Sequence, residues 1–342
     1  MRLKWQALFH EVWRFRLAYS GGGASRRRDQ SVPVSEKLMI RRIRRAAHGG
    51  RPGRGIGDDC AVLPIPRGHE ALVTTDFSLE GVHFRRDWHP PDSVGHRCLA
   101  RGLSDIAAMG GMPRAAFLSL ALPGEFPQQW VDRFIAGLLK LATRFSIPLA
   151  GGDTAQSPDG VLADIVVLGS VHRGQAILRS GARPGDFIYV TGTLGPAAAA
   201  LNRLRDGEKL RPRSHVKHFY PEPRLAVGQF LRERKLASAM IDISDGLSTD
   251  LGHICEESKT GAVVYAESLP AIAGKDGLRF ALHSGDEYEL LFTARPNHRI
   301  PKQIAGVPVT RIGEITRGRQ MKLVEANGKA GILKPAGWEH FA

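Results

Sequence analysis

Short apolar runs alternate along the chain with longer stretches in which apolar residues recur at helical spacing. Apolar runs bounded by Gly, Pro and Asp are typical of buried strands, whereas apolar positions three and four residues apart indicate amphipathic helices. Strands that alternate with helices in this way indicate an α/β or α+β protein. The predicted strands are Ala71–Thr75, Ala115–Leu122, Ile165–Val171, Phe187–Thr191, Ala262–Ala266 and Tyr288–Thr293. The predicted helices are Ser35–Ala47, with Ser35 as N-cap, Ser93–Met109, Gln128–Phe145, Pro196–Arg205, Pro223–Glu233 and Gly246–Ser258.

The length of 342 residues predicts two domains, because a domain usually takes roughly 100–200 residues. The turn-rich segment Arg179–Asp186 is the predicted boundary, which gives an N-terminal domain at 34–178 and a C-terminal domain at 179–342. Residues 1–33 contain three consecutive glycines followed by three arginines. We expect them to form a basic, disordered extension, since this composition cannot bury a core.

The formal net charge of +14 would favour a nucleic-acid partner if it were spread over the folded part of the chain. Residues 1–54 hold 14 Lys and Arg against 3 Asp and Glu, and the remaining 288 residues hold 34 against 31. The rest of the chain is therefore nearly neutral and lacks the clustered positive charge that nucleic-acid binding requires. We do not expect nucleic acid as a partner.

The three cysteines, Cys60, Cys98 and Cys255, are far apart and have no zinc-site spacing. No apolar run approaches the ~20 residues that cross a bilayer. Arg14 and Arg16 interrupt the apolar start that a signal peptide would need. These features predict a cytoplasmic protein with no membrane partner.

Aspartates beside glycine or small hydroxyl residues recur in five segments. A single Asp beside Gly is common in plain turns and helix N-caps, so each segment alone is compatible with a structural role. Carboxylates that converge repel one another unless cations lie between them, and oxygen ligands of this kind suit Mg²⁺. Together the segments predict a site for several Mg²⁺ ions. They are Gly57-Asp58-Asp59, Thr74-Thr75-Asp76, Ser104-Asp105, Gly151-Gly152-Asp153-Thr154 and Asp242-Ile243-Ser244-Asp245-Gly246.

The chain contains neither a P-loop nor the protein-kinase motifs, so phosphate binding must be arranged in another way. One candidate is the segment Thr191–Pro196, which leaves a predicted strand and opens a predicted helix. Its free backbone N–H groups could bind an anion, or it could be an ordinary strand–turn–helix connection. Arg179 and Arg183 could neutralise a triphosphate or be solvated.

The motifs, in this order, resemble the thiamine-monophosphate kinase family from about residue 35 to the C-terminus. They include the aspartate segments and extend to other parts of the chain. The further matching segments are Gly55-Ile56, Gly81-Val82-His83-Phe84, Leu103 to Gly110, Arg179-Ser180-Gly181-Ala182 and Gly337-Trp338-Glu339-His340-Phe341.

The resemblance implies the two-domain fold of aminoimidazole ribonucleotide synthetase, with an N-terminal sheet that completes a barrel across a homodimer and a C-terminal α/β domain. It implies transfer of a phosphoryl group from ATP to thiamine monophosphate, which gives thiamine diphosphate. The implied metal ligands are Asp59, Thr74, Thr75, Asp76, Asp105, Asp153, Asp242 and Asp245. The implied ATP contacts are Gly152, Asp153, Arg179 and Ser244, and the implied substrate contacts are His83, Asp286 and Trp338.

The chain departs from the family where Gly285-Asp286-Glu287-Tyr288 replaces the usual Gly-Glu-Asp-Tyr, which leaves open whether Asp286 or Glu287 meets the thiamine. The alternatives within the superfamily are selenophosphate synthetase, aminoimidazole ribonucleotide synthetase and a hydrogenase-maturation dehydratase. The first typically carries a reactive Cys or selenocysteine near its start and the last a C-terminal Cys. This chain ends in Glu339-His340-Phe341-Ala342, which favours the kinase.

Overall fold

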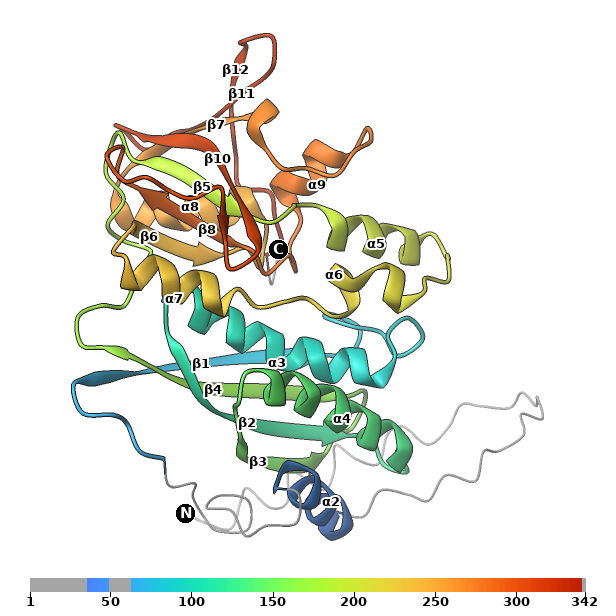
Figure 1. The fold of residues 1–342 in the computed structure, drawn as a ribbon. Coiled ribbons are helices and arrows are strands. Elements are labelled where there is room, and N and C mark those ends of the chain that lie inside the picture. The colour runs from blue at the N-terminus through green and yellow to red at the C-terminus, as the bar shows by residue number, and fades with distance from the viewer. Residues whose placement is uncertain (1–35, 49–62, 340–342) are drawn as a thin grey trace, which may run out of the picture. The chain divides into compact units, whose positions relative to one another are not determined.

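The computed structural model describes residues 36–48 and 63–339 (Figure 1). The predicted metal ligand Asp59, the Ser35 N-cap and the extension at residues 1–33 lie outside these ranges. The main helices are α2 (Glu36–His48), α3 (Pro91–Ala108), α4 (Gln128–Arg144), α5 (Pro196–Arg205), α6 (Val216–Phe219), α7 (Leu225–Glu233), α8 (Leu247–Ser258) and α9 (Gly277–His283). The strands are β1 (His69–Leu79), β2 (Met112–Leu122), β3 (Leu149–Gln156), β4 (Leu162–His172), β5 (Phe187–Thr191), β6 (Ala237–Asp242), β7 (Gly261–Tyr265), β8 (Leu290–Ala294), β9 (Gln303–Ile304), β10 (Val307–Thr316), β11 (Met321–Val324) and β12 (Ala330–Ile332).

The first four strands form a sheet in the order β1-β4-β2-β3, with β2 and β3 parallel and the other pairs antiparallel. Helices α3 and α4 cover one face of this sheet (Figure 1). Side chains alternate between the two faces of a strand. On β1, Leu72 is therefore buried under α3, whereas Val73 and Phe77 are 67% and 55% exposed on the opposite face. We refer to this opposite face as the open face.

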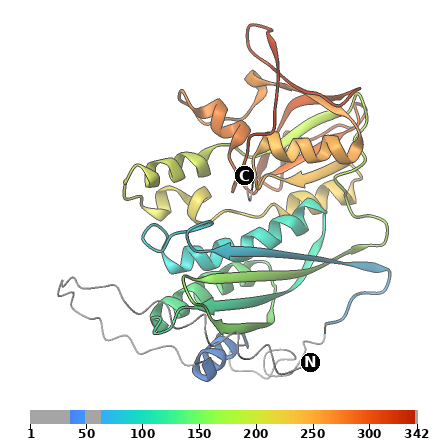
Figure 2. The same ribbon diagram turned by 180° about the vertical axis from the view of Figure 1, so that it is seen from behind.

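The later strands form a second, mostly antiparallel sheet in the order β12-β11-β7-β10-β5-β8-β6, to which β9 adds at β10. Helix α8 covers the face that is seen from behind (Figure 2). Its apolar residues Leu247, Leu251, Ile254 and Cys255 fall at helical spacing and are buried in the core of this part of the chain.

Helix α3 packs against both groups of strands, because it contacts the first sheet on one side and α7 and β6 on the other. A helix in this position has little solvent-exposed surface, and most of its residues are buried. Its polar residues therefore need partners within the protein. Ser104 Oγ donates a hydrogen bond to Asp242 Oδ2 at 2.6 Å, and the Arg97 guanidinium forms an ion pair with Asp286 at 2.8 Å. Polar residues of α3 are thus linked directly to the end of β6 and to the loop before β8.

The structure confirms the predicted helices and strands with boundary shifts of a few residues and confirms the mixed α/β class. The predicted strand at Tyr288–Thr293 begins later, at Leu290, because Tyr288 adopts a positive φ of 52°. The predicted helix at Pro223–Glu233 begins at Leu225. The sequence pattern missed the helices α6 and α9 and the strands β3, β6 and β9 to β12. Of these, β3 is rich in glycine and polar residues. No helix among residues 36–48 and 63–339 is long and apolar enough to cross a membrane.

Candidate active site

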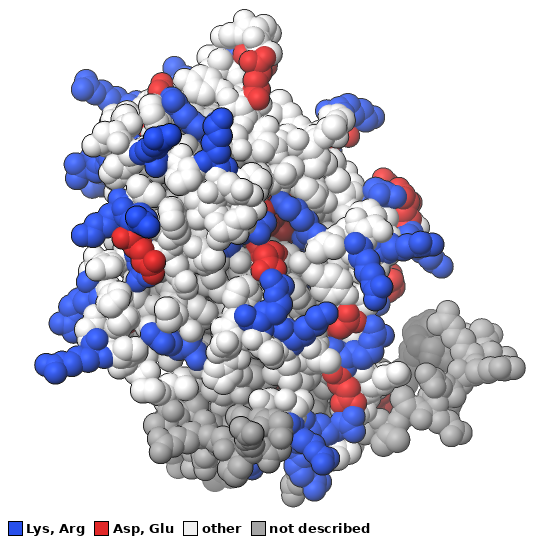
Figure 3. All heavy atoms as spheres, viewed as in Figure 1, with Lys and Arg blue, Asp and Glu red and all other residues white. Residues whose placement is uncertain are grey.

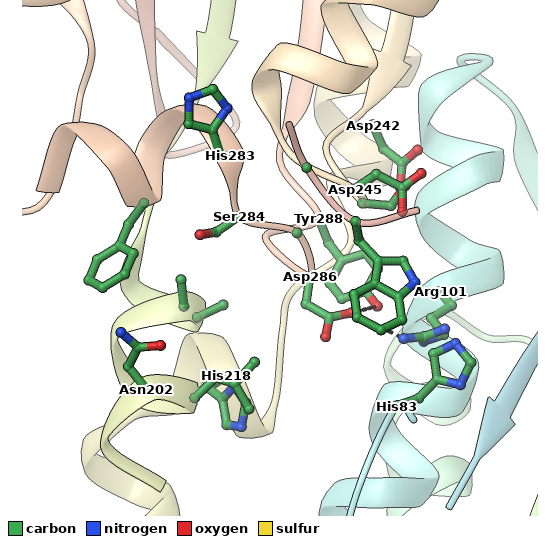
Figure 4. A pocket seen from close by; sticks show the side chains of 18 of the residues that line it. His83, Arg101, Asn202, His218, Asp242, Asp245, His283, Ser284, Asp286 and Tyr288 are labelled. Carbon is green, nitrogen blue, oxygen red and sulfur yellow. Dashed lines mark hydrogen bonds and ion pairs between the residues drawn. The ribbon is translucent and has the colours of Figure 1, made fainter. Parts of the chain in front are cut away.

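A cavity of about 510 Å³ brings together most of the residues that the sequence assigned to a site. Figure 4 shows its labelled side chains, which come from helices α3, α5, α6 and α9, from the end of β6, and from the loops after β1, after β6 and before β8. In the view of Figure 3, acidic side chains lie near the middle of the face, with Lys and Arg around them. The predicted site residues that line the cavity are Asp76, His83, Asp105, Asp242, Ser244, Asp245, Asp286 and Trp338.

Three carboxylates, Asp76, Asp105 and Asp242, form an acidic cluster on one side of the cavity. Burial raises the pKa of Asp76 to about 7, and the charge of Asp105 adds to this rise. Burial likewise raises the pKa of Asp105, and burial together with the charge of Asp105 raises that of Asp242 well above its usual range. Thr74 Oγ1 donates a hydrogen bond to Asp105. Proximity and burial therefore disfavour the simultaneous ionisation of these groups unless a cation joins them.

The acidic cluster fits a divalent cation. Asp76 Oδ2 is buried and has no hydrogen-bond partner among the described residues. A buried carboxylate oxygen without a partner is costly, and oxygen ligands from several carboxylates are what Mg²⁺ prefers. The acidic cluster thus brings together three of the eight predicted metal ligands in a donor set that suits Mg²⁺.

A second acidic group lies beside the first. Ligand atoms of Asp245, Asp250 and His253 lie within 4.8 Å of one another. Asp250 Oδ2 accepts hydrogen bonds from the backbone N–H groups of Asp245 and Gly246, at 3.3 and 3.0 Å. Burial, followed by the charge of Asp245, raises the pKa of Asp250 to about 7. Asp250 therefore holds the turn that places Asp245 at the cavity.

These pKa shifts predict that Mg²⁺ stabilises the protein more at pH 8 than at pH 5.5. Asp76 titrates at about 7 in the folded protein and near 3.8 in an unfolded chain, so its contribution to the free energy of unfolding falls as the pH rises from about 4 to about 7. Bound Mg²⁺ would remove that penalty, but below pH 6 it must compete with protons. Thermal unfolding with and without Mg²⁺ at matched ionic strength measures the effect. An equal increase in Tm at both pH values would contradict this account.

The loop from Ser284 to Glu289 is held against the turn after β6 in an unusual backbone conformation. Asp286 and Tyr288 have φ values of 60° and 52°, which non-glycine residues rarely adopt. Asp286 N–H donates to Ser244 O at 2.8 Å, and Tyr288 N–H donates to Ile243 O at 2.9 Å. A Cβ on Gly285 would lie 2.2 Å from Ser244 O, so only glycine permits this close approach. Residues with rare backbone conformations of this kind cluster at functional sites.

The adjacent acids Asp286 and Glu287 of this loop point to different environments. Asp286 lines the cavity, where Arg97 bonds its Oδ2 and Arg101 and Tyr288 Oη–H bond its Oδ1. Burial favours the neutral acid, but the two arginine charges outweigh it and hold the pKa of Asp286 well below its usual range. Glu287 instead points to the start of α5. Its Oε1 accepts from Gly195 N and Ala197 N at 2.9 and 3.2 Å.

Glu287 also decides between the two alternatives for the segment Thr191–Pro196. The N–H groups of Gly195 and Ala197 donate to the buried Glu287, and those of Gly192 and Leu194 donate to backbone carbonyls of the protein. Burial raises the pKa of this carboxyl to about 8. Next to it, buried Glu289 forms ion pairs with Lys217 and Arg224. The segment is therefore a strand–turn–helix connection with an internal cap.

Some predicted site residues lie away from the cavity. Thr75 points to the open face of the first sheet, where its Oγ1 donates to Asp164 Oδ1 at 2.8 Å. Gly152 and Asp153 lie on β3, three strands from β1, which is about 14 Å at a spacing of ~4.8 Å per strand. Asp164 pairs with Ser119, and Ser119 pairs with Asp153, so Asp153 also lies on the open face. Arg179 is exposed and does not line the cavity.

The sequence analysis identified Asp105 on α3 but missed Arg97 and Arg101, which support or line the same cavity. Arg97, Arg101 and Asp105 are spaced four residues apart and therefore lie on one face of the helix. Ser104 adjoins them and bonds Asp242. The sequence contained the information needed to find both arginines. They precede the expected metal ligand Asp105 by one and two helical turns, so they lie on the same face of the helix as Asp105. Tyr288 was also missed, since it was assigned to a strand.

The comparison with known families and proteins agrees with this architecture. Residues 57–171 match the N-terminal domain of AIR synthase related proteins, and residues 183–325 match the C-terminal domain. Thiamine-monophosphate kinase of Salmonella typhimurium is 39% identical over 304 residues, which cover 84% of this chain and 92% of that protein. The Bacillus subtilis enzyme of the same name is 32% identical over 315 residues, which cover 87% and 96%.

Solved structures give the same result. The crystal structure of thiamine-monophosphate kinase from Stenotrophomonas maltophilia is 37% identical, covers 88% of this chain and 99% of its own, and has a TM-score of 0.75. AaThiL complexed with AMPPCP and TMP is 29% identical, covers 94% and 100%, and has a TM-score of 0.72. Hydrogenase maturation protein HypE of E. coli, at 18% identity and a TM-score of 0.73, shares the fold alone. The resemblance that the motifs indicated is confirmed, and the chain belongs to the thiamine-monophosphate kinase family.

Proposed function

We propose that the protein transfers the γ-phosphoryl group of ATP to the phosphate of thiamine monophosphate and releases thiamine diphosphate and ADP. One observation carries the proposal: the partly buried cluster of Asp76, Asp105 and Asp242 shares a single cavity with the predicted substrate residues. The relatives that carry the same activity in their names match this chain over most of its length.

The residues of the chain bind and align two anionic groups rather than move protons. A phosphate acceptor is already ionised near neutral pH, so the transfer needs alignment and charge neutralisation more than a strong general base. The proposed Mg²⁺ ligands are the acidic cluster with Asp59, Thr74, Thr75, Asp153 and Asp245. Bound Mg²⁺ would neutralise phosphate charge and stabilise the transferring group. Gly152, Asp153, Arg179 and Ser244 are the proposed ATP contacts.

The substrate end of the cavity is formed by His83, Asp286 and Trp338. Trp338 is 48% exposed, and its backbone N–H donates to Asp245 O at 2.9 Å, which ties the C-terminal segment to the turn after β6. An exposed indole at a cavity mouth suits stacking on a flat aromatic ring. Since Asp286 lines the cavity and Glu287 points to α5, we assign Asp286 rather than Glu287 to the substrate end.

Incubation of the purified protein with Mg²⁺, ATP and thiamine monophosphate tests the function. We expect thiamine diphosphate and ADP in equal amounts, measured by chromatography. Formation of ADP and inorganic phosphate without thiamine diphosphate would contradict the proposed acceptor.

The proposal includes a homodimer in which two first sheets complete a barrel. The open face carries the exposed apolar side chains Val73 and Phe77, and exposed apolar side chains that share one face are typical of an interaction surface. Thr75 and Asp153 lie on the same face, so a second copy could bring them to a shared metal that one chain alone cannot assemble. We also propose a cytoplasmic location, which suits the free, buried thiols of Cys98 and Cys255.

We expect Val73→Asp to convert the dimer to a monomer, because it would place a carboxylate in a buried apolar interface. Light scattering coupled to size-exclusion chromatography measures the mass. The matched control is Ile332→Asp, which alters an equally exposed apolar side chain on β12, outside the first sheet. A monomeric wild-type protein, or a V73D variant that stays dimeric, would contradict the proposed interface.

A further inference from the structure

We propose that Arg101 binds the phosphate group of the acceptor substrate, and that Asp286 is the residue that positions the Arg101 guanidinium. This inference rests on the proposed function and assigns a role to a residue that the motifs do not include. It is argued from the contacts, the charge balance and the location of Arg101.

The guanidinium of Arg101 is fixed in place by two hydrogen bonds. Its Nη1–H donates to Phe77 O at 3.0 Å, and its Nη2–H donates to Asp286 Oδ1 at 3.1 Å. The side chain is 13% exposed and lines the cavity. These bonds use two of the five N–H donors of a guanidinium, and a rigid fork with remaining donors is well suited to phosphate oxygens.

The charge balance at this point favours an anion. Asp286 carries one negative charge and pairs with two arginines, Arg97 and Arg101. The group of three residues therefore has a net charge of +1. Arg97 is only 4% exposed, so the excess positive charge faces the cavity through Arg101. Both carboxylate oxygens of Asp286 are engaged by Arg97, Arg101 and Tyr288. Asp286 therefore acts at the substrate end through the position of Arg101 and not through direct contact with the substrate cation.

The location of Arg101 is suited to a phosphate that must reach the metal ligands. Arg101 lies one helical turn before Asp105 on α3. Its Nη1–H bonds the carbonyl oxygen of Phe77, the residue that follows Asp76, so the guanidinium lies beside the strand segment that carries Asp76. Figure 4 shows Arg101 between the aspartates after β6 and His83, at the Asp286 side of the cavity. A phosphate bound here would lie between the acidic cluster and the substrate end.

Two other arginines line the same cavity but lack this fixation. Arg205 is exposed at the end of α5, and the Arg279 side chain is 60% exposed and pairs with Asp276 at 3.4 Å. An exposed arginine must lose more conformational freedom when it binds a ligand. Arg101 is therefore the cavity arginine that is best prepared to bind an anionic oxygen.

The test compares two ligands that differ only in the phosphate. Calorimetry with Mg²⁺ and without ATP would measure the affinities of thiamine monophosphate and of thiamine for the wild-type protein and Arg101→Gln. We expect the variant to bind the monophosphate at least ~10-fold more weakly, because a charge-assisted hydrogen bond is lost. The affinity for thiamine should stay within about twofold. Arg144→Gln, which removes a surface ion pair with Glu222 outside the cavity, is the matched control and should change neither affinity.

Three results would overturn the inference. Equal losses for both ligands would mean that Arg101 only maintains the cavity, and an unchanged monophosphate affinity would mean that it does not bind the phosphate. A loss confined to a non-hydrolysable ATP analogue would assign Arg101 to the donor phosphate instead. The variant Asp286→Asn tests the positioning role. It should weaken the binding of thiamine monophosphate but not that of thiamine, whereas loss of a direct contact to the thiamine cation would weaken the binding of both ligands equally. Failure of the proposed function would appear separately, as a wild-type protein that forms no thiamine diphosphate, and would remove this inference with it.

Discussion

Replacing Asp105 with Asn should lower the turnover of thiamine monophosphate by roughly two orders of magnitude or more at low Mg²⁺. The substitution keeps the shape of the side chain, including an oxygen that can accept the hydrogen bond from Thr74 Oγ1. It removes the negative charge through which Asp105 would bind Mg²⁺. Turnover should recover in part as the Mg²⁺ concentration rises, since weaker affinity can be offset by concentration.

A magnesium titration of turnover separates the three roles that Asp105 could have. A general base would leave a defect that added Mg²⁺ cannot restore, and the wild-type pH–rate profile would show a limb that belongs to it. If Asp105 had a purely structural role, its replacement would lower the free energy of unfolding by at most about 1 kcal/mol and leave turnover near the wild-type value. The matched control is Asp92→Asn on the same helix, since Asp92 bonds Arg133 and Tyr220 outside the cavity. An unchanged rate in a folded D105N variant would remove Asp105 from the site.

The sequence predicted elements whose local pattern agrees with their environment. Strand β5 and helix α5 have the predicted bounds, because an apolar run ends at a glycine turn and an Ala-rich helix begins at Pro196. The aspartates of the acidic cluster were also identified, because they stand in segments that contain small hydroxyl residues and that resemble the motifs of the family. The sequence could predict that these segments carry chemistry, but their convergence is a property of the packing of α3 against β6.

Other parts of the site depend on backbone conformations and contacts that a local pattern does not contain. The directions in which Asp286 and Glu287 point follow from the positive φ values of Asp286 and Tyr288. The sequence pattern assigned Tyr288 to a strand and gave no conformation for Asp286. The role of Arg97 and Arg101 depends on a partner almost 190 residues away. The direction of the Thr75 side chain, by contrast, could have been predicted from the sequence. Thr74, Thr75 and Asp76 are consecutive in a strand, so the middle residue must point to the opposite face.

Removal of divalent cations should abolish ATP binding at pH 8, with a loss of affinity of at least ~100-fold. At that pH Asp76, whose pKa is about 7, is ionised for the most part, and ATP is a polyanion. The acidic cluster would then repel the nucleotide, and Arg101 is already paired with Asp286. Calorimetry of a non-hydrolysable ATP analogue with and without EDTA measures the loss, and excess Mg²⁺ added back should restore binding.

The same titration at a lower pH tests whether electrostatic repulsion causes the loss of ATP binding. Below pH 6 protons neutralise part of the acidic cluster, so the repulsion between the carboxylates and the nucleotide weakens. The difference in affinity between samples with and without EDTA should therefore be smaller at pH 5.5 than at pH 8. Equal affinity with and without EDTA at pH 8 would mean that the nucleotide is held by groups other than a metal bound to the aspartates. In that case two positive charges would have to supply the binding that the acidic cluster opposes. They are Arg101, which lines the cavity, and Arg179, which is exposed outside the cavity lining but whose charge opposes the rise that burial causes in the pKa of Asp105.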